Sequence, residues 1–196
     1  MNLKQYKKWL EEHANKEERQ AYEVAKLIID YHTYDFDYEN IKIFPRKRFN
    51  GIEFDLLIYI YKKSSKPENR TGRDILIGVE FKENDMDKVI KQAIARKEFV
   101  DYMYIATCCR VWNVEQLFLL ALYGIGWILW DGDYVRLILE PKRYANKVDT
   151  LINYLFDRKL REVIDDAIER RLKQIDEKIQ RRLDEWVNHQ NKFKSD

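Results

Sequence analysis

Cysteine is scarce in this chain: there are two cysteines, Cys108 and Cys109, and they are adjacent in the sequence. Without further cysteines the chain has neither a disulfide framework nor a complete set of zinc ligands. The three histidines are scattered, and none has a partner at the spacing of metal ligands. We therefore expect two reduced thiols in a cytoplasmic protein.

The chain also lacks an excess of one charge and a long hydrophobic run. Its net charge is only +2, so a surface for nucleic acid has to come from local clusters of Lys and Arg. The longest apolar stretch, residues 117–130, is too short for a bilayer and is broken by Gly124 and Gly126. The N-terminus is rich in Lys and Glu and does not resemble a secretory signal. We expect no membrane association.

The composition suits a folded domain, because apolar residues make up 45% of the 196 residues. Hydrophobic periodicity and turn signals predict helices and strands in alternation, which is typical of an α/β fold. Asn15 and Glu18 have the spacing of a capping box. Helices are expected at residues 3–13, 16–31, 85–100 and 114–123, and strands at 41–44, 53–61, 75–82, 102–106, 127–130 and 134–139.

After Pro141 the pattern becomes purely helical, and the chain is expected to divide there into a main domain, residues 1–141 with a short N-terminal helix at 2–13, and a helical extension, residues 142–196. A sustained apolar stripe favours a long C-terminal helix that packs on a partner, so we expect a homodimer held by it. Packing of this helix onto its own domain is the alternative. The stripe consists of Leu160, Ile164, Ile168, Leu172, Ile175, Ile179, Leu183 and Trp186.

A candidate site lies at the ends of two apolar runs. Glu80 and Lys82 end the strand at 75–82, and they project from one face because side chains alternate along a strand. Asp55 directly precedes the apolar run 56–60. If the two strands pair, two carboxylates and a lysine surround a small volume, which suits Mg²⁺ or Mn²⁺ and an attacking water. A structural cluster of ion pairs is the alternative interpretation.

Asp55 followed by Glu80-Phe81-Lys82, in this order of helices and strands, resembles the PD-(D/E)xK nuclease superfamily, to which archaeal Holliday junction resolvases belong. The resemblance covers roughly residues 16–140 and implies a restriction endonuclease-like core with a central mixed sheet flanked by helices. It implies that Asp55 and Glu80 bind the metal and that Lys82 is catalytic. The carbonyl of Phe81 would be a further ligand.

Two further positions follow from the same resemblance. Many members carry a metal-binding Glu on the first helix, for which Glu18 and Glu23 compete here. Some branches carry a Gln on the helix after the lysine strand, which Gln92 matches. The Tyr that follows four residues later in those branches is replaced by Arg96.

Two clusters of basic residues are candidates for binding a DNA backbone, which requires such clusters. One lies in a predicted loop shortly before Asp55, and the other lies along the predicted helix 85–100. For the helical cluster a solvated helix face is an equally good interpretation. The first cluster is Arg46, Lys47 and Arg48, and the second is Lys88, Lys91, Arg96 and Lys97.

Together these features predict a metal-dependent DNA endonuclease with Mg²⁺ or Mn²⁺ as cofactor and DNA as partner. By resemblance, the reaction is the hydrolysis of phosphodiester bonds that leaves a 5′-phosphate. Two alternatives stay open: a nucleic-acid-binding or assembly protein that keeps the fold without cleaving, and a helical interaction protein whose globular part is a platform.

Overall fold

The computed structural model describes residues 1–34, 40–49, 51–62, 74–108, 112–132, 134–144, 169–171 and 173–182. The chain forms two compact units, Met1–Asn153 and Tyr154–Asp196. The sequence had placed this boundary at residues 141 and 142. None of the helices in the described part of the chain has the length and apolar character needed to cross a bilayer.

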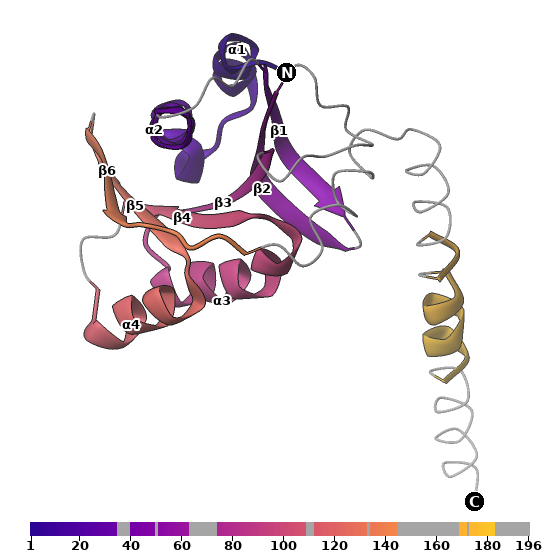
Figure 1. The fold of residues 1–196 in the computed structure, drawn as a ribbon. Helices are drawn as coiled ribbons and strands as arrows, with labels where there is room; N and C mark the ends of the chain where they lie inside the picture. The colour runs from indigo at the N-terminus through magenta and orange to yellow at the C-terminus, as the bar shows by residue number, and fades with distance from the viewer. Residues whose placement is uncertain are drawn as a thin grey trace, which may run out of the picture. The chain divides into compact units, whose positions relative to one another are not determined.

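The first unit is built on a six-stranded mixed sheet whose strands follow one another in chain order (Figure 1). Neighbouring strands are antiparallel except for β3 with β4 and β4 with β5, which are parallel. The predicted α/β class with a mixed sheet flanked by helices is therefore confirmed. The strands are β1 Asn40–Phe49, β2 Ile52–Tyr61, β3 Ile75–Lys82, β4 Tyr102–Thr107, β5 Gly126–Asp131 and β6 Tyr134–Leu139.

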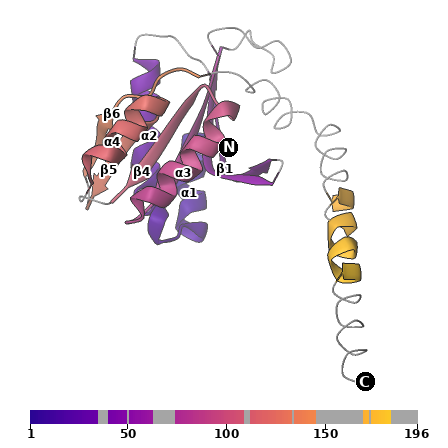
Figure 2. The same cartoon turned by 90° about the horizontal axis from the view of Figure 1, so that it is seen from below.

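Helices cover both faces of the sheet, as Figures 1 and 2 show: α1 and α2 lie on one side, and α3 and α4 lie on the other. Alternate side chains of the strands, such as Ile58 in β2 and Ile77 in β3, pack against α1 and α2 in one continuous hydrophobic cluster. The intervening side chains, Glu80 among them, face α3. The helices are α1 Leu3–His13, α2 Ala21–Thr33, α3 Met86–Arg96 and α4 Val114–Tyr123.

The segment between α1 and α2 differs from the single helix predicted at 16–31. The capping box is confirmed, because the Asn15 side chain accepts from the N–H groups of Glu17 and Glu18 and the Glu18 carboxylate accepts from Asn15 N–H. It closes only a short 3₁₀ turn, η1 Lys16–Glu18, after which α2 begins at Ala21 without a side-chain cap. The break separates Glu17 and Glu18 from the long helix.

The basic segment before β2 is not the predicted loop: Arg46, Lys47 and Arg48 lie within β1. β1 is an edge strand, so one of its sides has no neighbouring strand. Pro45 is tolerated there because no N–H donor is needed on that outer side. Pro45 pairs with Leu56 and Lys47 with Phe54, so Arg46 stands opposite Asp55 with no inserted residue, and the ladder skips this one pair where the φ of Arg46, 46°, is left-handed.

The helix after β3 differs at both ends from the predicted range 85–100. Asp85 is its cap rather than its first residue, and it ends at Arg96, where a 3₁₀ turn, η3 Lys97–Phe99, replaces its last predicted turn. In the second unit, residues 169–171 and 173–182 are helical. The rest of the predicted C-terminal stripe lies outside the described residues, so a single long helix stays a prediction.

Candidate active site at the ends of β2 and β3

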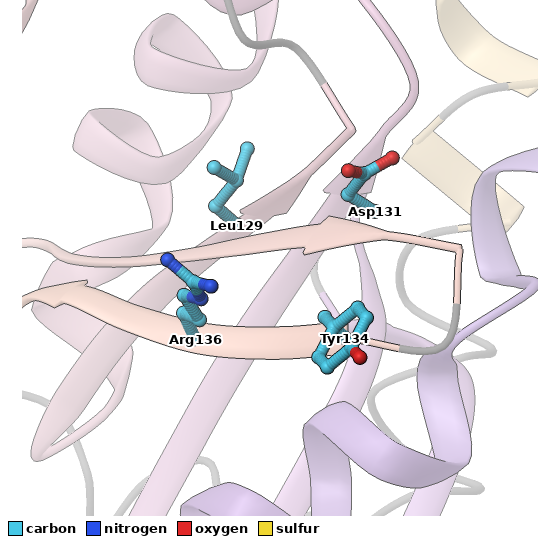
Figure 3. Close-up of a pocket in the computed structure, with 4 residues that line it drawn as sticks. All are labelled: Leu129, Asp131, Tyr134 and Arg136. Carbon is cyan, nitrogen blue, oxygen red and sulfur yellow. The ribbon is translucent and has the colours of Figure 1, made fainter.

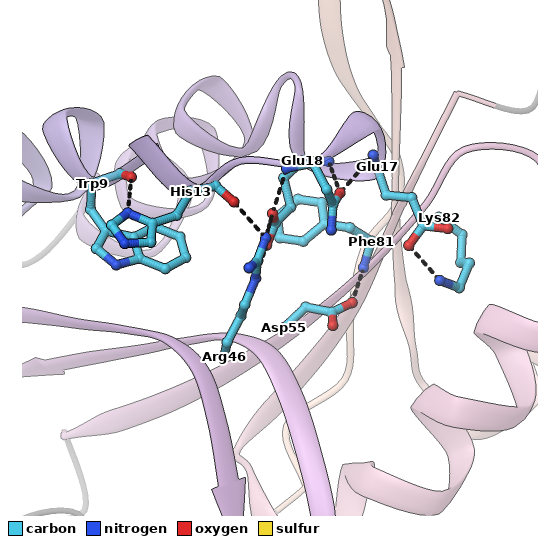
Figure 4. A network of polar contacts seen from close by, with 9 residues as sticks. Trp9, His13, Glu17, Glu18, Arg46, Asp55, Phe81 and Lys82 are labelled. Atoms are coloured by element: carbon cyan, nitrogen blue, oxygen red, sulfur yellow. Dashed lines mark hydrogen bonds and ion pairs between the residues drawn. The ribbon is translucent and has the colours of Figure 1, made fainter. Parts of the chain in front are cut away.

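The structure brings Asp55 and Glu80 together on neighbouring strands. The antiparallel register pairs Leu56 with Val79, so the next step along each strand places Asp55 opposite Glu80 on the same face. At this point the backbone ladder ends, and the Asp55 carboxylate replaces it by accepting from Phe81 N–H, with Oδ2 2.8 Å from N (Figure 4). Glu80 has no exposed surface, while Asp55 is half-buried.

Both carboxyl groups have raised pKa values. The pKa of Glu80 is raised to about 9, mainly by burial and next by the negative charge of Asp55. The nearby cation Arg96 lowers this pKa by less than Asp55 raises it. Burial also raises the pKa of Asp55, against the opposing effects of the Phe81 N–H and of Lys82 and Arg96. Two buried carboxylates side by side therefore disfavour each other's ionisation. A second strong positive charge at this position would relieve both.

Arg96 turns inward from α3. Its Nη1 pairs with Glu80 Oε2, and its side chain is only 14% exposed. The sequence had grouped Arg96 with Lys91 on a basic outer side of the helix, and that placement is wrong for Arg96, whereas Lys91 is exposed. Arg96 supplies positive charge next to Glu80.

Lys82 also has an acidic partner, but not one that the sequence suggested. Its Nζ lies 2.5 Å from Glu17 Oε2 of η1, so the ammonium group is paired with Glu17 rather than with Asp55 or Glu80 (Figure 4). The sequence considered Glu18 and Glu23 as the acid that the first helix contributes. No sequence signal singles out Glu17, because its proximity to Lys82 depends on how η1 lies across the end of β3.

Glu18 is buried and engaged by Arg46. Arg46 Nε lies 3.1 Å from Glu18 Oε1, and its Nη2 pairs with Oε2 and donates to the carbonyl of His13 at 2.8 Å. The Arg46 guanidinium also lies 5.3 Å from the centre of the Trp9 ring, a cation–π contact. Glu18 is therefore not placed as a free ligand beside Asp55, and Glu23 is exposed on α2.

Three buried polar atoms near these residues have no hydrogen-bond partner within the described part of the chain: Glu80 Oε1, Gln92 Oε1 and Tyr6 Oη. Buried unpaired atoms of this kind call for an explanation such as an ion or a water. Tyr6 is a residue that sequence reasoning missed. Burial and the charges of Glu18 and Asp55 raise its pKa, which places its hydroxyl near both acids.

The oxygen atoms of the acid pair are ligands of the type that a hard divalent cation prefers. Two carboxylates are, however, fewer ligands than such an ion needs for a full shell. Among the described residues, no group of three or more His, Cys, Asp or Glu side chains could hold a metal ion. Mg²⁺ is commonly held by one or two carboxylates and completes its shell with water and substrate phosphate oxygens. Asp55 and Glu80 supply that minimum, and Glu80 Oε1 is a buried oxygen that lacks a partner.

The remaining basic residues lie on the surface or near it. Arg48 is exposed and pairs with Glu53 at 2.9 Å, and Lys47 is half-buried in β1. Exposed pairs of this kind contribute little to stability. Arg48 can therefore exchange its partner for a phosphate at small cost, in contrast to Arg46.

Comparison with known proteins adds little to this geometry. No family model and no curated protein matches the chain. Among solved structures, a protein of unknown function from Silicibacter pomeroyi has a TM-score of 0.36 and 12% sequence identity, over 69% of this chain and 79% of that chain. A similarity at this level carries no argument about fold family or function.

Proposed function

We propose that the protein is a metal-dependent DNA endonuclease with a restriction endonuclease-like core, in which Asp55, Glu80 and Lys82 form the reactive centre. One observation carries the proposal: the fully buried Glu80 carboxylate has an unpartnered oxygen, Oε1, next to a second carboxylate on the neighbouring strand. Buried acids with strongly raised pKa values concentrate at functional sites.

In this proposal Asp55 and Glu80 hold Mg²⁺ or Mn²⁺, with the Phe81 carbonyl as a further oxygen ligand. The ion supplies Lewis-acid chemistry, acidifying a bound water and neutralising charge on the phosphate. The Asp55 carboxylate is held in place by its hydrogen bond from Phe81 N–H. As a ligand Glu80 would be ionised, and Arg96, its partner on Oε2, would remain beside the site as a source of positive charge. Gln92, one helical turn before Arg96, brings its amide to the same side of α3.

Lys82 is the residue that would orient the water and stabilise developing charge. Its present partner is Glu17, whose side chain is about one-third exposed, at 36%. Water screens an ion pair with a partly exposed acid, so Glu17 holds Lys82 weakly and a phosphate can take its place. Lys82 can thus change partners without disturbing the buried acids.

DNA would be bound by the basic residues that are not committed to buried acids. Lys47, Arg48 and Lys91 are such residues, whereas Arg46 holds Glu18 and so orders η1. We also infer a homodimer through the C-terminal helix, whose described part exposes Ile175 and Ile179. Sedimentation of the full chain and of a form truncated after Asn153 tests this, and a monomeric full-length protein contradicts it.

A second candidate is a nucleic-acid-binding protein in which the charged cluster is only structural. The pairs Arg96–Glu80 and Lys82–Glu17 favour it, since each cation already has a partner. A cleavage assay over linear, single-stranded, flapped and junction DNAs separates the two, with Mg²⁺, Mn²⁺ or a chelator. Cleavage that depends on the metal supports the endonuclease. Binding to DNA without cleavage of any substrate supports the structural cluster.

A further inference from the structure

A small pocket lies on the hairpin of β5 and β6, apart from the acid pair. It is lined by Leu129 and Asp131 of β5 and by Tyr134 and Arg136 of β6, and its volume is about 220 Å³ (Figure 3). Leu129 pairs with Arg136, and Asp131 pairs with Tyr134, so all four side chains belong to one face of the hairpin.

The register of the sheet relates this pocket to the acid pair. Lys82 pairs with Thr107, Thr107 with Leu129, and Leu129 with Arg136, so Lys82 and Arg136 lie in one row across the same face. Three strand spacings separate them, about 14 Å at roughly 4.8 Å per strand. Both lie where the parallel strands β3, β4 and β5 end, and ligands of α/β sheets bind outside the carboxyl ends of such strands.

The hairpin is also tied to the segment that carries Glu17. Gln20 Nε2, three residues after Glu17, donates to the carbonyl of Gly132 at the hairpin tip, at 2.6 Å. The pocket is therefore fixed in place relative to the acid pair within the first unit. A strand of nucleic acid lying across this edge of the sheet can reach both.

The lining of the pocket has the chemistry of a nucleobase site. Tyr134 is 71% exposed, and its ring is open to an aromatic partner. Nucleobases stack on such rings whatever their sequence. The exposed Arg136 offers donors that match ring nitrogens and carbonyl oxygens of bases, while the Asp131 carboxylate can accept from an exocyclic amino group. A bare phosphate is a poorer match, because Asp131 repels it.

We propose that this pocket binds one unstacked nucleobase of the DNA substrate. The proposal rests on the endonuclease function and names its substrate class: DNA that is single-stranded or branched near the cleaved bond. In a duplex the base would first have to leave its stack, which costs a few kcal/mol. The pocket therefore discriminates against continuous duplex DNA.

Binding without cleavage tests the site independently of catalysis. The probe is a fluorescent single-stranded DNA of about 20 nucleotides, longer than the roughly 4–16 nucleotides that single-strand-binding folds cover. Its anisotropy is measured with the full chain in the presence of a chelator, with the matching duplex as competitor. Tyr134→Ala is expected to weaken single-strand binding about 5- to 150-fold, the range that corresponds to loss of one stacked base.

Three comparisons make the result specific. Tyr134→Phe keeps the ring and is expected to bind as the wild type does, and so is Ile138→Ala, a control at an exposed position of the same strand, outside the pocket. A series of probes with one abasic position each is expected to contain a position whose base loss weakens wild-type binding but not that of Tyr134→Ala.

The outcomes separate this site from the endonuclease function. The nucleobase site is overturned if every abasic probe binds the wild type equally well. It is also overturned if Tyr134→Ala loses single-strand and duplex binding equally. Both hold even if the protein cleaves DNA. A base-dependent probe position in a protein that cleaves no DNA with Mg²⁺ or Mn²⁺ supports the site and overturns the endonuclease.

Discussion

Two buried acid clusters at opposite ends of the same strands differ in how completely they are satisfied. At one end, Asp101 accepts from Leu76 N–H at 2.8 Å and from Arg143 Nε at 3.2 Å, while Arg143 also reaches the Asp74 carbonyl. At the other end, Glu80 Oε1 has no partner among the described residues.

The difference shows what a structural acid looks like in this fold. Both oxygens of the Asp101 carboxylate accept hydrogen bonds, one from a backbone N–H of β3 and one from a guanidinium group after β6. These bonds join β3, the start of β4 and the segment after β6. Glu80 also has a guanidinium partner, Arg96, on Oε2, but it faces a second acid, Asp55, and burial raises its pKa to about 9. Two adjacent acids disfavour each other's ionisation, an arrangement that a cluster serving stability alone does not need. We therefore interpret the Asp101 cluster as structural and the Asp55–Glu80 pair as functional.

The largest expected effect is on cleavage. If the proposed metal site exists, Asp55→Asn and Glu80→Gln each remove one of its charged ligands, so the cleavage rate should fall by roughly a thousandfold or more, because several kcal/mol of charge stabilisation are lost. Glu53→Gln is the matched control, an exposed acid on the same strand, and should retain activity. Single-turnover rates on the best substrate measure this, and equal activity in all three variants would remove the distinction between the two clusters.

Lys82 and its partner Glu17 should behave differently from each other. Lys82→Ala should lower the cleavage rate by about 100-fold while metal and DNA affinity stay near the wild-type values, because the lysine acts mainly in the transition state. Glu17→Gln should keep activity, since it releases Lys82 from its resting partner. A loss of metal binding in Lys82→Ala, measured by calorimetry, would show that the lysine supports the fold of the site instead.

Stability should follow the opposite pattern. Asp101→Ala leaves the buried Leu76 N–H without its acceptor, so the free energy of unfolding should fall by about 1–3 kcal/mol. Glu80→Gln should leave the metal-free protein about as stable as the wild type near pH 7, because a carboxyl whose pKa is raised to about 9 is already neutral there and the amide is its neutral counterpart. Urea unfolding with a chelator measures both. A large loss in Glu80→Gln would place Glu80 among the structural acids.

The last effect, small per pH unit, is a pH dependence of stability. A carboxyl whose pKa is higher in the folded than in the unfolded chain binds its proton more tightly when folded, so stability falls as pH rises between the two values. Between about pH 7 and pH 9 the wild type should therefore lose up to about 1.4 kcal/mol per pH unit relative to Glu80→Gln. The half-buried His32 does not interfere, because burial lowers its pKa to about 4. Parallel stability curves for the two proteins would show that Glu80 is ionised in the folded state.

The sequence predicted the elements and the meeting of Asp55 with Glu80 because both depend on local periodicity. Alternation along β3 places Glu80 on one face, and pairing with the adjacent apolar run brings Asp55 beside it. The left-handed conformation of Arg46 within β1 was missed, since a proline in a basic segment also suits a loop and the edge position of β1 is a tertiary fact.

The partners of the charged groups could not be predicted. Arg96 pairs with Glu80, Lys82 with Glu17 and Arg46 with Glu18 across 16, 65 and 28 residues of sequence. These contacts depend on how α3 and η1 lie against the end of the sheet, which no local pattern encodes. The nuclease assignment itself stays a prediction that rests on resemblance and on the acid pair.

A calorimetric titration of Mn²⁺ into the metal-free full chain tests the central claim most directly. We expect saturable binding that tightens as pH rises, since Glu80 must release its proton to become a ligand. Asp55→Asn and Glu80→Gln should abolish it, and Asp101→Asn should retain it. Absence of Mn²⁺ binding in the wild type, or equal binding in Glu80→Gln, would contradict the account and leave the acid pair as part of the framework of the fold.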